Sequence, residues 1–156
     1  MKKLLLLAVL AVFAFTGCQQ AKPVKTIENL KAGIKGETTA SAKYAAFALK
    51  AQEEGNVAVA KLFNAASKAE GIHAANHQKV LEGLGEKMEA FTPEFEVKTT
   101  LENLQAALDG ETYETETMYP QFLADAATEK VEKATQSFTW ASDTEKKHQE
   151  FYKNAI

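Results

Sequence analysis

The chain has 156 residues, of which 46% are hydrophobic, and this length and composition predict one folded domain that buries a core of its own. Its 18 basic residues are all lysines, and 21 acidic residues outnumber them to give a net charge of −3. Proteins that bind nucleic acid depend on a basic surface and rely heavily on arginine, so this composition excludes that class.

The first 20 residues have the pattern of a targeting segment. Two lysines precede an uncharged run over 4–15, which is too short to span a bilayer but typical of a signal peptide. The run ends in FTGC, which resembles the cleavage site of bacterial lipoprotein precursors, where the last residue, here Cys18, becomes the lipidated N-terminus. We therefore expect a lipoprotein signal peptide over 1–17, a lipidated tether over 18–25 and a folded domain over 26–156. The alternative is an ordinary secretory signal. A lipid anchor would hold the protein on the extracytoplasmic side of a membrane, in the periplasm or at the cell surface.

Two long helices are predicted at the start of the folded domain. The first runs from about Thr26 to Glu54, with apolar residues at helical spacing, and Gly55 marks its end. The same spacing predicts a second helix over about 57–83. A connection of about fifteen residues follows, which contains Pro93 and is long enough to cross the end of a helix bundle.

Two more helices are predicted after this connection. The third begins at Thr99 or Thr100, is expected to kink at Pro120, and continues to about residue 128. The fourth is predicted over about 130–154. Two long helix pairs around one long connection predict an all-α, ferritin-like four-helix bundle, with the crossover between helices two and three.

Ionisable side chains lie on the apolar stripe of every predicted helix. The first and third helices carry glutamates there, and the second and fourth each carry a Glu-x-x-His motif. Burying unpaired charge costs several kcal/mol per ion, and no lysine lies on these stripes to offset it, so bound cations are expected. The side chains that point into the bundle are Glu37, Glu70, His73, Glu111, Glu114, Glu145 and His148.

The spacing of these residues indicates a site for two metal ions. Residues three apart on a helix face one direction, so Glu-x-x-His offers a bridging carboxylate and a terminal nitrogen. A Glu from each of two helices and a Glu-x-x-His from each of the other two is the pattern of diiron carboxylate bundles. Oxygen and imidazole ligands suit iron or manganese. We therefore expect two iron ions per bundle, with manganese or a mixed pair as the alternative. For any single motif, a solvated helix face is the competing interpretation.

From about Thr26 to Tyr152, the chain resembles the diiron domain of rubrerythrin. The matching stretches are KAQEEG at 50–55, AEGIHA at 69–74, NLQAA at 103–107 and GETYETETMYP at 110–120. The resemblance implies that all seven residues named above are metal ligands. Glu114 is a carboxylate beyond the set of four Glu and two His. In rubrerythrins the matching Glu and the His of the first motif alternate as ligands to one iron, which implies the same for Glu114 and His73.

Four further aromatic or histidine positions lie near this pattern. Tyr44 and Tyr119 match two tyrosines near the rubrerythrin site, which implies a hydrogen-bonding or electron-relay role. Core packing is the alternative for both. His77 is expected to be a partly exposed helix histidine. The alternative is that it supports the metal ligands without binding metal itself. Trp140 is expected to pack in the core or at its edge.

The resemblance implies a function as well as a site. It implies an oxidoreductase of oxidative-stress defence that reduces hydrogen peroxide, with Glu114 and the two tyrosines taking part. Rubrerythrin proper also carries a rubredoxin-like domain with two Cys-x-x-Cys motifs, but this chain has no Cys after residue 18. Electrons are therefore expected from a separate, unidentified donor. A homodimer is expected, since the family is commonly dimeric. The alternatives are a ferroxidase or iron-handling lipoprotein that reacts with oxygen, and a non-enzymatic helical surface lipoprotein.

Overall fold

The computed structural model describes residues 21–156, so the predicted signal peptide and Cys18 lie outside the described residues. Within that range all the regular secondary structure is helical. The elements are α1 (Val24–Glu53), α2 (Val57–Gly83), α3 (Thr100–Tyr113), the π-helical segment η1 (Glu114–Met118), α4 (Tyr119–Thr128) and α5 (Glu132–Ala155). None of the described helices is both long and apolar enough to cross a membrane.

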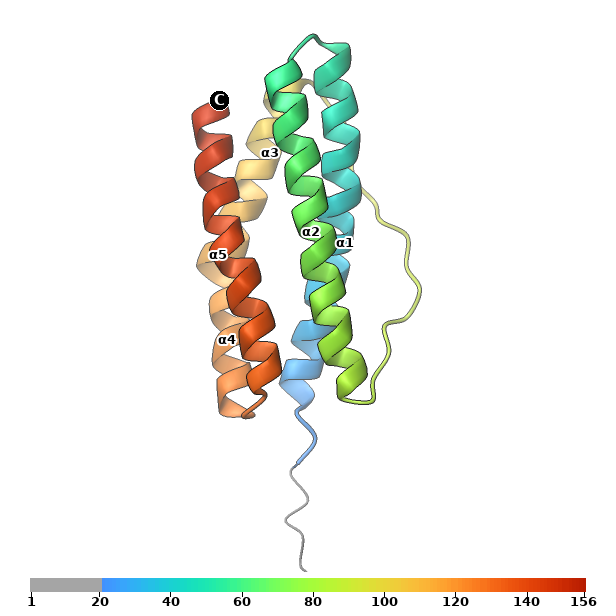
Figure 1. The fold of residues 1–156 in the computed structure, drawn as a ribbon, viewed down its shortest axis with the longest axis vertical. Coiled ribbons are helices and arrows are strands. Elements are labelled where there is room, and N and C mark those ends of the chain that lie inside the picture. The colour runs from blue at the N-terminus through green and yellow to red at the C-terminus, as the bar shows by residue number, and fades with distance from the viewer. Residues whose placement is uncertain (1–20) are drawn as a thin grey trace, which may run out of the picture.

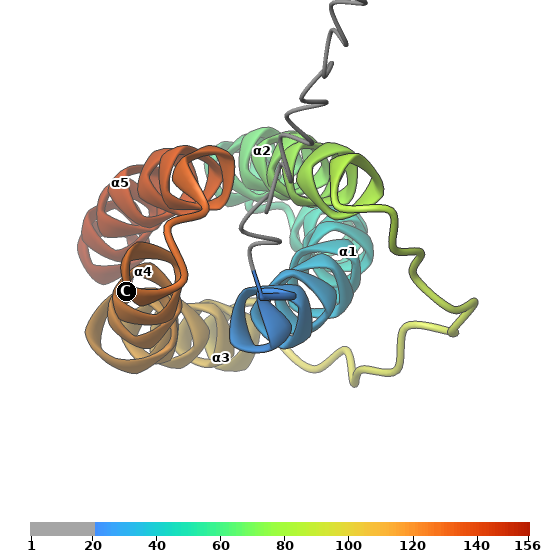
Figure 2. The ribbon, with the colours of Figure 1, turned by 90° about the horizontal axis from the view of Figure 1, so that it is seen from below.

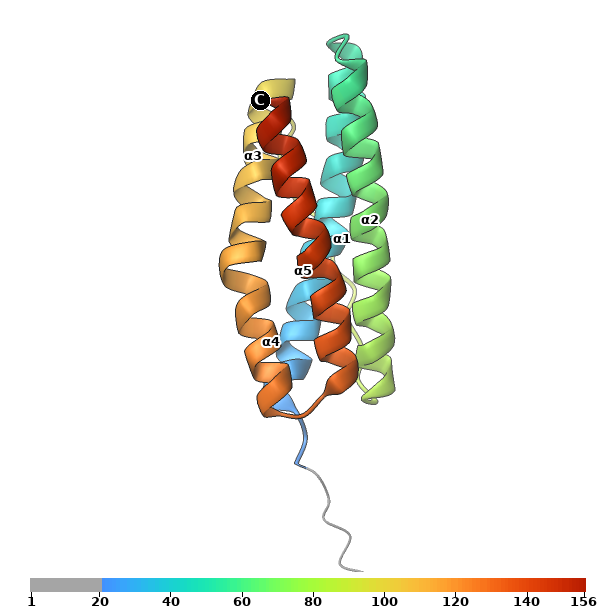
Figure 3. The ribbon, with the colours of Figure 1, turned by 60° about the vertical axis from the view of Figure 1, so that its left-hand side comes forward.

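The helices form a four-helix bundle. α3, η1 and α4 follow one another as a single long rod, which stands beside α1, α2 and α5 (Figure 3). Seen from one end, the four rods surround one common interior (Figure 2). The connection over 84–99 runs along the outside of α1 from one end of the bundle to the other (Figure 1). The predicted all-α bundle with one long crossover between the second and third helices is confirmed.

Carboxylates at the helix ends fix how the rods meet. Glu129, at the end of α4, accepts hydrogen bonds from the backbone N–H groups of Lys25 and Thr26 at 3.0 and 2.7 Å. Glu54, after α1, accepts one from the N–H of Thr100 at 2.9 Å. Both contacts place a negative charge on a helix N-terminus, where the free N–H groups and the helix dipole favour it. The Glu129 contact joins helix ends about a hundred residues apart in the chain, and the Glu54 contact joins ends about fifty residues apart.

Local backbone chemistry explains the start of two helices. α3 begins with a capping box, in which the side chain of Thr99 accepts from the N–H of Glu102 and the Glu102 carboxylate accepts from the N–H of Thr99. Of the two threonines predicted as caps, Thr99 is therefore the one that caps. α5 begins at Glu132, two residues later than predicted, because Lys130 has a φ of 58° and cannot be part of a right-handed helix.

The irregularity expected at Pro120 takes the form of η1. The N–H of Tyr119 bonds to the carbonyl oxygen of Glu114, five residues back, which is the π-helical spacing. Proline lacks an N–H, and its ring crowds the carbonyl four residues earlier, so the helix widens in the turn before Pro120 and resumes α geometry with α4. The widened turn begins at Glu114, one of the predicted ligands.

The apolar core consists of two separate clusters. One is built around Leu30, Tyr119 and Phe138, and the other around Phe47 and Phe63. Each buried aromatic side chain stabilises the folded state by roughly 1.5–3 kcal/mol, because its apolar surface is removed from water. The buried charged residues fall between the two clusters along the chain, so a polar layer lies inside an otherwise apolar bundle.

Candidate metal centre

Side chains from α1, α2, α3 and α5 converge on this polar layer. They form two groups, and within each group the candidate ligand atoms all lie within 4.8 Å of one another. The first group is Glu37, Glu70, His73 and Glu145, and the second is Glu70, Glu111, Glu145 and His148. Glu70 and Glu145 belong to both groups. The structure therefore brings together six of the seven predicted ligands as two adjacent four-residue clusters with two shared carboxylates.

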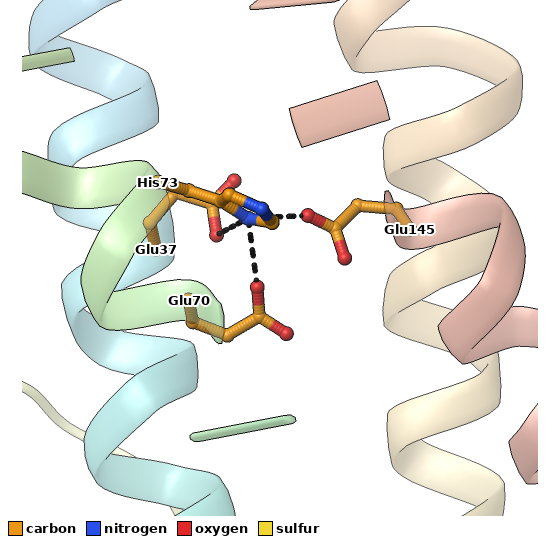
Figure 4. Close-up of side chains that lie close together, drawn as sticks. All are labelled: Glu37, Glu70, His73 and Glu145. Carbon is orange, nitrogen blue, oxygen red and sulfur yellow. Dashed lines mark ion pairs between the residues drawn. The ribbon is translucent and has the colours of Figure 1, made fainter. Parts of the chain in front are cut away.

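The first group surrounds one ring nitrogen of His73. Its Nδ1 atom lies 3.0 Å from Oε2 of Glu70, 2.7 Å from Oε1 of Glu145 and 3.7 Å from Oε2 of Glu37. Figure 4 shows this imidazole among carboxylates that come from α1, α2 and α5. Three chain segments thus place oxygen donors around one nitrogen donor.

The second group repeats the arrangement around His148. Its Nδ1 atom lies 3.1 Å from Oε1 of Glu70, 2.7 Å from Oε2 of Glu145 and 3.7 Å from Oε1 of Glu111. Glu70 and Glu145 therefore each present one oxygen to His73 and the other oxygen to His148. This is the arrangement of a carboxylate that bridges two metal ions.

The burial of these donors tests whether metal ions fit. Glu37 and Glu145 are completely buried, and Glu70 and Glu111 are 1% exposed. Apart from the ion-pair contacts with one another, several donor atoms in this layer have no hydrogen-bond partner: Glu37 Oε2, both carboxylate oxygens of Glu70 and of Glu145, and Nδ1 of His73 and of His148. Orphaned buried carboxylates cost several kcal/mol unless a charge compensates them. No lysine reaches the layer in the described part of the chain, so two divalent cations fit the donor set.

Without metal, protons take the place of cations. Burial raises the pKa of Glu37 to about 8, and burial together with the charges of Glu70 and Glu145 raises the pKa of Glu111 to about 10. Burial lowers the pKa of a histidine, but bonds to the carboxylates outweigh it and raise the pKa of His73 to about 12 and that of His148 to about 9. A metal ion must displace these protons in order to bind.

Glu114 lies beside the two groups and belongs to neither. It is the first residue of η1, is partly buried, and, in the part of the chain that the structure describes, makes no hydrogen bond or ion pair with the donor atoms of either group. Burial and the charges of Glu37 and Glu111 raise its pKa well above the usual range, so its carboxyl group is close enough to the site to feel the other carboxylates. Its role as an exchangeable ligand stays a prediction.

Tyr44 and Tyr119 hold the two unshared carboxylates. The hydroxyl of Tyr44 donates to Oε1 of Glu111 at 2.8 Å, and the hydroxyl of Tyr119 donates to Oε1 of Glu37. Both tyrosines are buried. A hydrogen bond to a metal-binding carboxylate fixes its orientation and tunes its basicity, and such partners matter nearly as much as the ligands themselves. The two tyrosines thus serve the site and pack in the core at once.

The expected exposure of His77 and the expected core position of Trp140 are wrong. His77 is completely buried, with Nδ1 2.7 Å from Oγ of Ser137 and Nε2 3.1 Å from the hydroxyl oxygen of Tyr119. The sequence feature that indicated burial of His77 was its position four residues after His73, because this spacing puts both side chains on one helix face. Trp140 is 53% exposed, because it lies on the outer side of α5 beside a groove instead of in the core.

Solved structures with the same fold define the class of protein. Fully reduced, all-ferrous nigerythrin matches with a TM-score of 0.78 and 39% identity over 83% of this chain and 65% of that one. A bacterioferritin of Rhodobacter capsulatus matches with a TM-score of 0.76 at 22% identity, over 84% of this chain and 82% of that one, and shows the fold alone. Together with the paired clusters, these matches define a ferritin-like bundle with a diiron-type carboxylate site.

Sequence comparison gives the family. The rubrerythrin family model matches residues 28–156, and the chain belongs to the rubrerythrin family. Nigerythrin of Nitratidesulfovibrio vulgaris is 41% identical over 81% of this chain, and rubrerythrin of Porphyromonas gingivalis is 31% identical over 84% of it. The matched part spans 63% of nigerythrin and 66% of the Porphyromonas protein.

Proposed function

We propose that the protein is a diiron oxidoreductase that reduces hydrogen peroxide to water with electrons from a separate donor. The observation that carries the proposal is the position of Glu70 and Glu145, each of which presents one oxygen to each histidine of the paired clusters. Glu70 and Glu145 would be shared by two metal ions bound in these clusters, and such a pair would supply two one-electron donors at one site. Membership of the rubrerythrin family supports the same reaction.

The reaction consumes two electrons and two protons for each peroxide: H₂O₂ + 2 e⁻ + 2 H⁺ gives 2 H₂O. Two bound ferrous ions supply one electron each when the site is loaded. We propose iron as the metal because every donor is a carboxylate oxygen or an imidazole nitrogen, and manganese is the alternative with the same ligand preference.

The chain's own residues orient the ligands and handle protons. Tyr44 and Tyr119 hold the carboxylates of Glu111 and Glu37 in place through their hydroxyl hydrogens. Burial and the charges of Glu37 and Glu111 raise the pKa of Glu114, which favours the protonated form of its carboxyl group, and this group can exchange a proton next to the site. The apolar clusters on both sides of the polar layer limit the access of water.

We further propose that Cys18 anchors the protein by lipid to the extracytoplasmic face of a membrane. The FTGC sequence after an uncharged run supports this location. Peroxide and the electron donor would then reach the bundle from outside the cytoplasm. The resemblance to a commonly dimeric family supports a homodimer.

The test is anaerobic loading with ferrous iron, followed by rapid mixing with peroxide or with oxygen. The proposal predicts fast oxidation by peroxide and oxidation by oxygen that is at least about tenfold slower, a difference of roughly 1.4 kcal/mol in activation free energy. Equal or faster reaction with oxygen would favour a ferroxidase. Absence of any bound iron would favour the non-enzymatic alternative.

A further inference from the structure

Three buried side chains form a hydrogen-bonded chain that leads away from Glu37. The hydroxyl of Tyr119 donates to Oε1 of Glu37, the Nε2 atom of His77 lies 3.1 Å from that hydroxyl oxygen, and Nδ1 lies 2.7 Å from Oγ of Ser137. Tyr119 and His77 are completely buried, and Ser137 is 3% exposed. The chain joins α4, α2 and α5, which come together only in the folded bundle.

The hydrogens in this chain all point toward Glu37. The Tyr119 hydroxyl donates its hydrogen to the carboxylate, so its oxygen can only accept from His77, and Nε2 must carry the ring hydrogen. Nδ1 is then an acceptor, and the Ser137 hydroxyl donates to it. The ring is neutral, because burial and the nearby charge of His73 lower the pKa of His77 to about 3.

The far end of the chain reaches a surface groove. Ser137 lines this groove, which lies between the end of α2 and the start of α5, together with Lys79, Gly83, Lys133 and Trp140. Trp140 is more than half exposed, so water can enter the groove. The three side chains therefore connect solvent with a carboxylate oxygen of the polar layer.

The surroundings of His77 hold its ring in place. A Cβ atom on Gly33 would lie 3.0 Å from Cδ2 of His77, so glycine at this position leaves room for the ring. Phe138 contacts the same ring edge-on, with the centroids 5.1 Å apart. An apolar side chain would suit this cluster without needing polar partners, so a histidine whose two nitrogens are both satisfied has a role other than filling space.

We infer that Ser137, His77 and Tyr119 form a proton route between this groove and Glu37. The inference rests on the proposed function, since peroxide reduction consumes two protons. In one passage a solvent proton binds Oγ of Ser137, whose own proton moves to Nδ1 of His77. The Nε2 proton moves to the oxygen of Tyr119, and the Tyr119 proton moves to Oε1 of Glu37 or to a substrate oxygen beside it. One proton is transferred and no electron moves, and the passage leaves the ring hydrogen of His77 on Nδ1 in place of Nε2.

The first test needs no metal. In metal-free protein with ¹⁵N-labelled histidine, NMR should show His77 with its hydrogen on Nε2 at neutral pH, and that hydrogen should exchange with solvent. Ser137→Ala should slow this exchange at least tenfold, and Ser137→Thr, which retains a hydroxyl, should restore it. Ser142→Ala, a buried serine on the same helix that is outside the hydrogen-bonded chain, is the matched control and should leave exchange unchanged. If the wild type and Ser137→Ala have the same melting temperature and the Nε2 hydrogen of His77 exchanges at the same rate in both, the proton route is overturned.

The second test uses iron-loaded protein in a single reaction with peroxide. Ser137→Ala should slow oxidation at least tenfold and increase the solvent deuterium isotope effect, while Ser142→Ala should do neither. Slower exchange in the metal-free variant without slower oxidation would overturn the role of the route in the reaction. Failure of the proposed function gives a different result, because the wild type itself would then not react with peroxide although the NMR result stands.

Discussion

The metal-free protein should lose stability as pH rises, and bound metal should reverse this trend. The pKa of Glu37 is raised from 4.5 to about 8 and that of Glu111 to about 10, so the folded state keeps protons that the unfolded chain has released. Folded-state stability from these groups is therefore present below about pH 4.5 and declines as pH rises toward 8 and 10. The pKa of His148 is raised from 6.5 to about 9, so this residue also stabilises the folded state less as pH rises between those two values.

The size of the effect follows from Glu37. When the pKa of a carboxyl group is 4.5 in the unfolded chain and about 8 in the folded state, the free energy of unfolding falls by roughly 5 kcal/mol once the pH exceeds both values. Domains of this size have total stabilities of about 5–15 kcal/mol. Even half of this effect should lower the melting temperature of the metal-free protein by roughly 10 °C between pH 5 and pH 9. Metal binding releases the protons, so affinity increases with pH and the stability gap between loaded and metal-free protein should widen.

The assay is thermal unfolding at pH 5, 7 and 9, in the presence of chelator and in anaerobic protein loaded with ferrous iron. Glu111→Gln removes an ionisable group but keeps an acceptor for Tyr44, so the metal-free variant should be more stable than wild type at pH 9. The same variant should bind metal more weakly. Glu89→Gln, an exposed position in the long connection, is the control and should change neither. A melting temperature of metal-free wild type that is constant or rises from pH 5 to pH 9 would refute the reasoning.

Three further predictions concern mechanism, anchoring and packing. Glu114→Gln should still bind two irons through the six clustered ligands but reduce peroxide at least about tenfold more slowly, a loss of roughly 1.4 kcal/mol; full turnover in stopped flow would contradict ligand exchange. Labelled palmitate should enter the wild type and be absent from Cys18→Ser, and equal labelling would rule out the lipid anchor. Phe63→Ala should lower the free energy of unfolding by about 3–5 kcal/mol in denaturant titrations, since Phe63 is completely buried. Leu49→Ala, at a site 65% exposed, should change it by less than about 0.5 kcal/mol.

The fold could be predicted because its signals are local. The bounds of α2 follow from apolar spacing and agree with the structure, and of the two capping residues predicted for α3, Thr99 and Thr100, the structure selects Thr99. The clustering of six candidate ligands could be predicted because charged side chains on an apolar stripe are costly unless something neutralises them. The anchor at Cys18 lies outside the described residues and stays a prediction.

Other features depend on the tertiary structure. The burial of His77 depends on a tyrosine and a serine from other helices, and spacing along α2 did not reveal these partners. The exposure of Trp140 depends on the groove between α2 and α5, which no single helix encodes. The π-helical segment that begins at Glu114 needs a widened backbone, and Pro120 alone indicated only an irregularity.

The central claim is that Glu70 and Glu145 bridge two metal ions, and metal counting tests it most directly. Anaerobic protein should be saturated with ferrous iron, freed of excess metal, and analysed for iron per chain. Wild type and Glu150→Gln, an exposed position on α5, should retain two irons, while Glu145→Gln on the same helix should retain fewer than one. One iron or none in the wild type, or two irons in Glu145→Gln, would contradict a paired site bridged by these carboxylates.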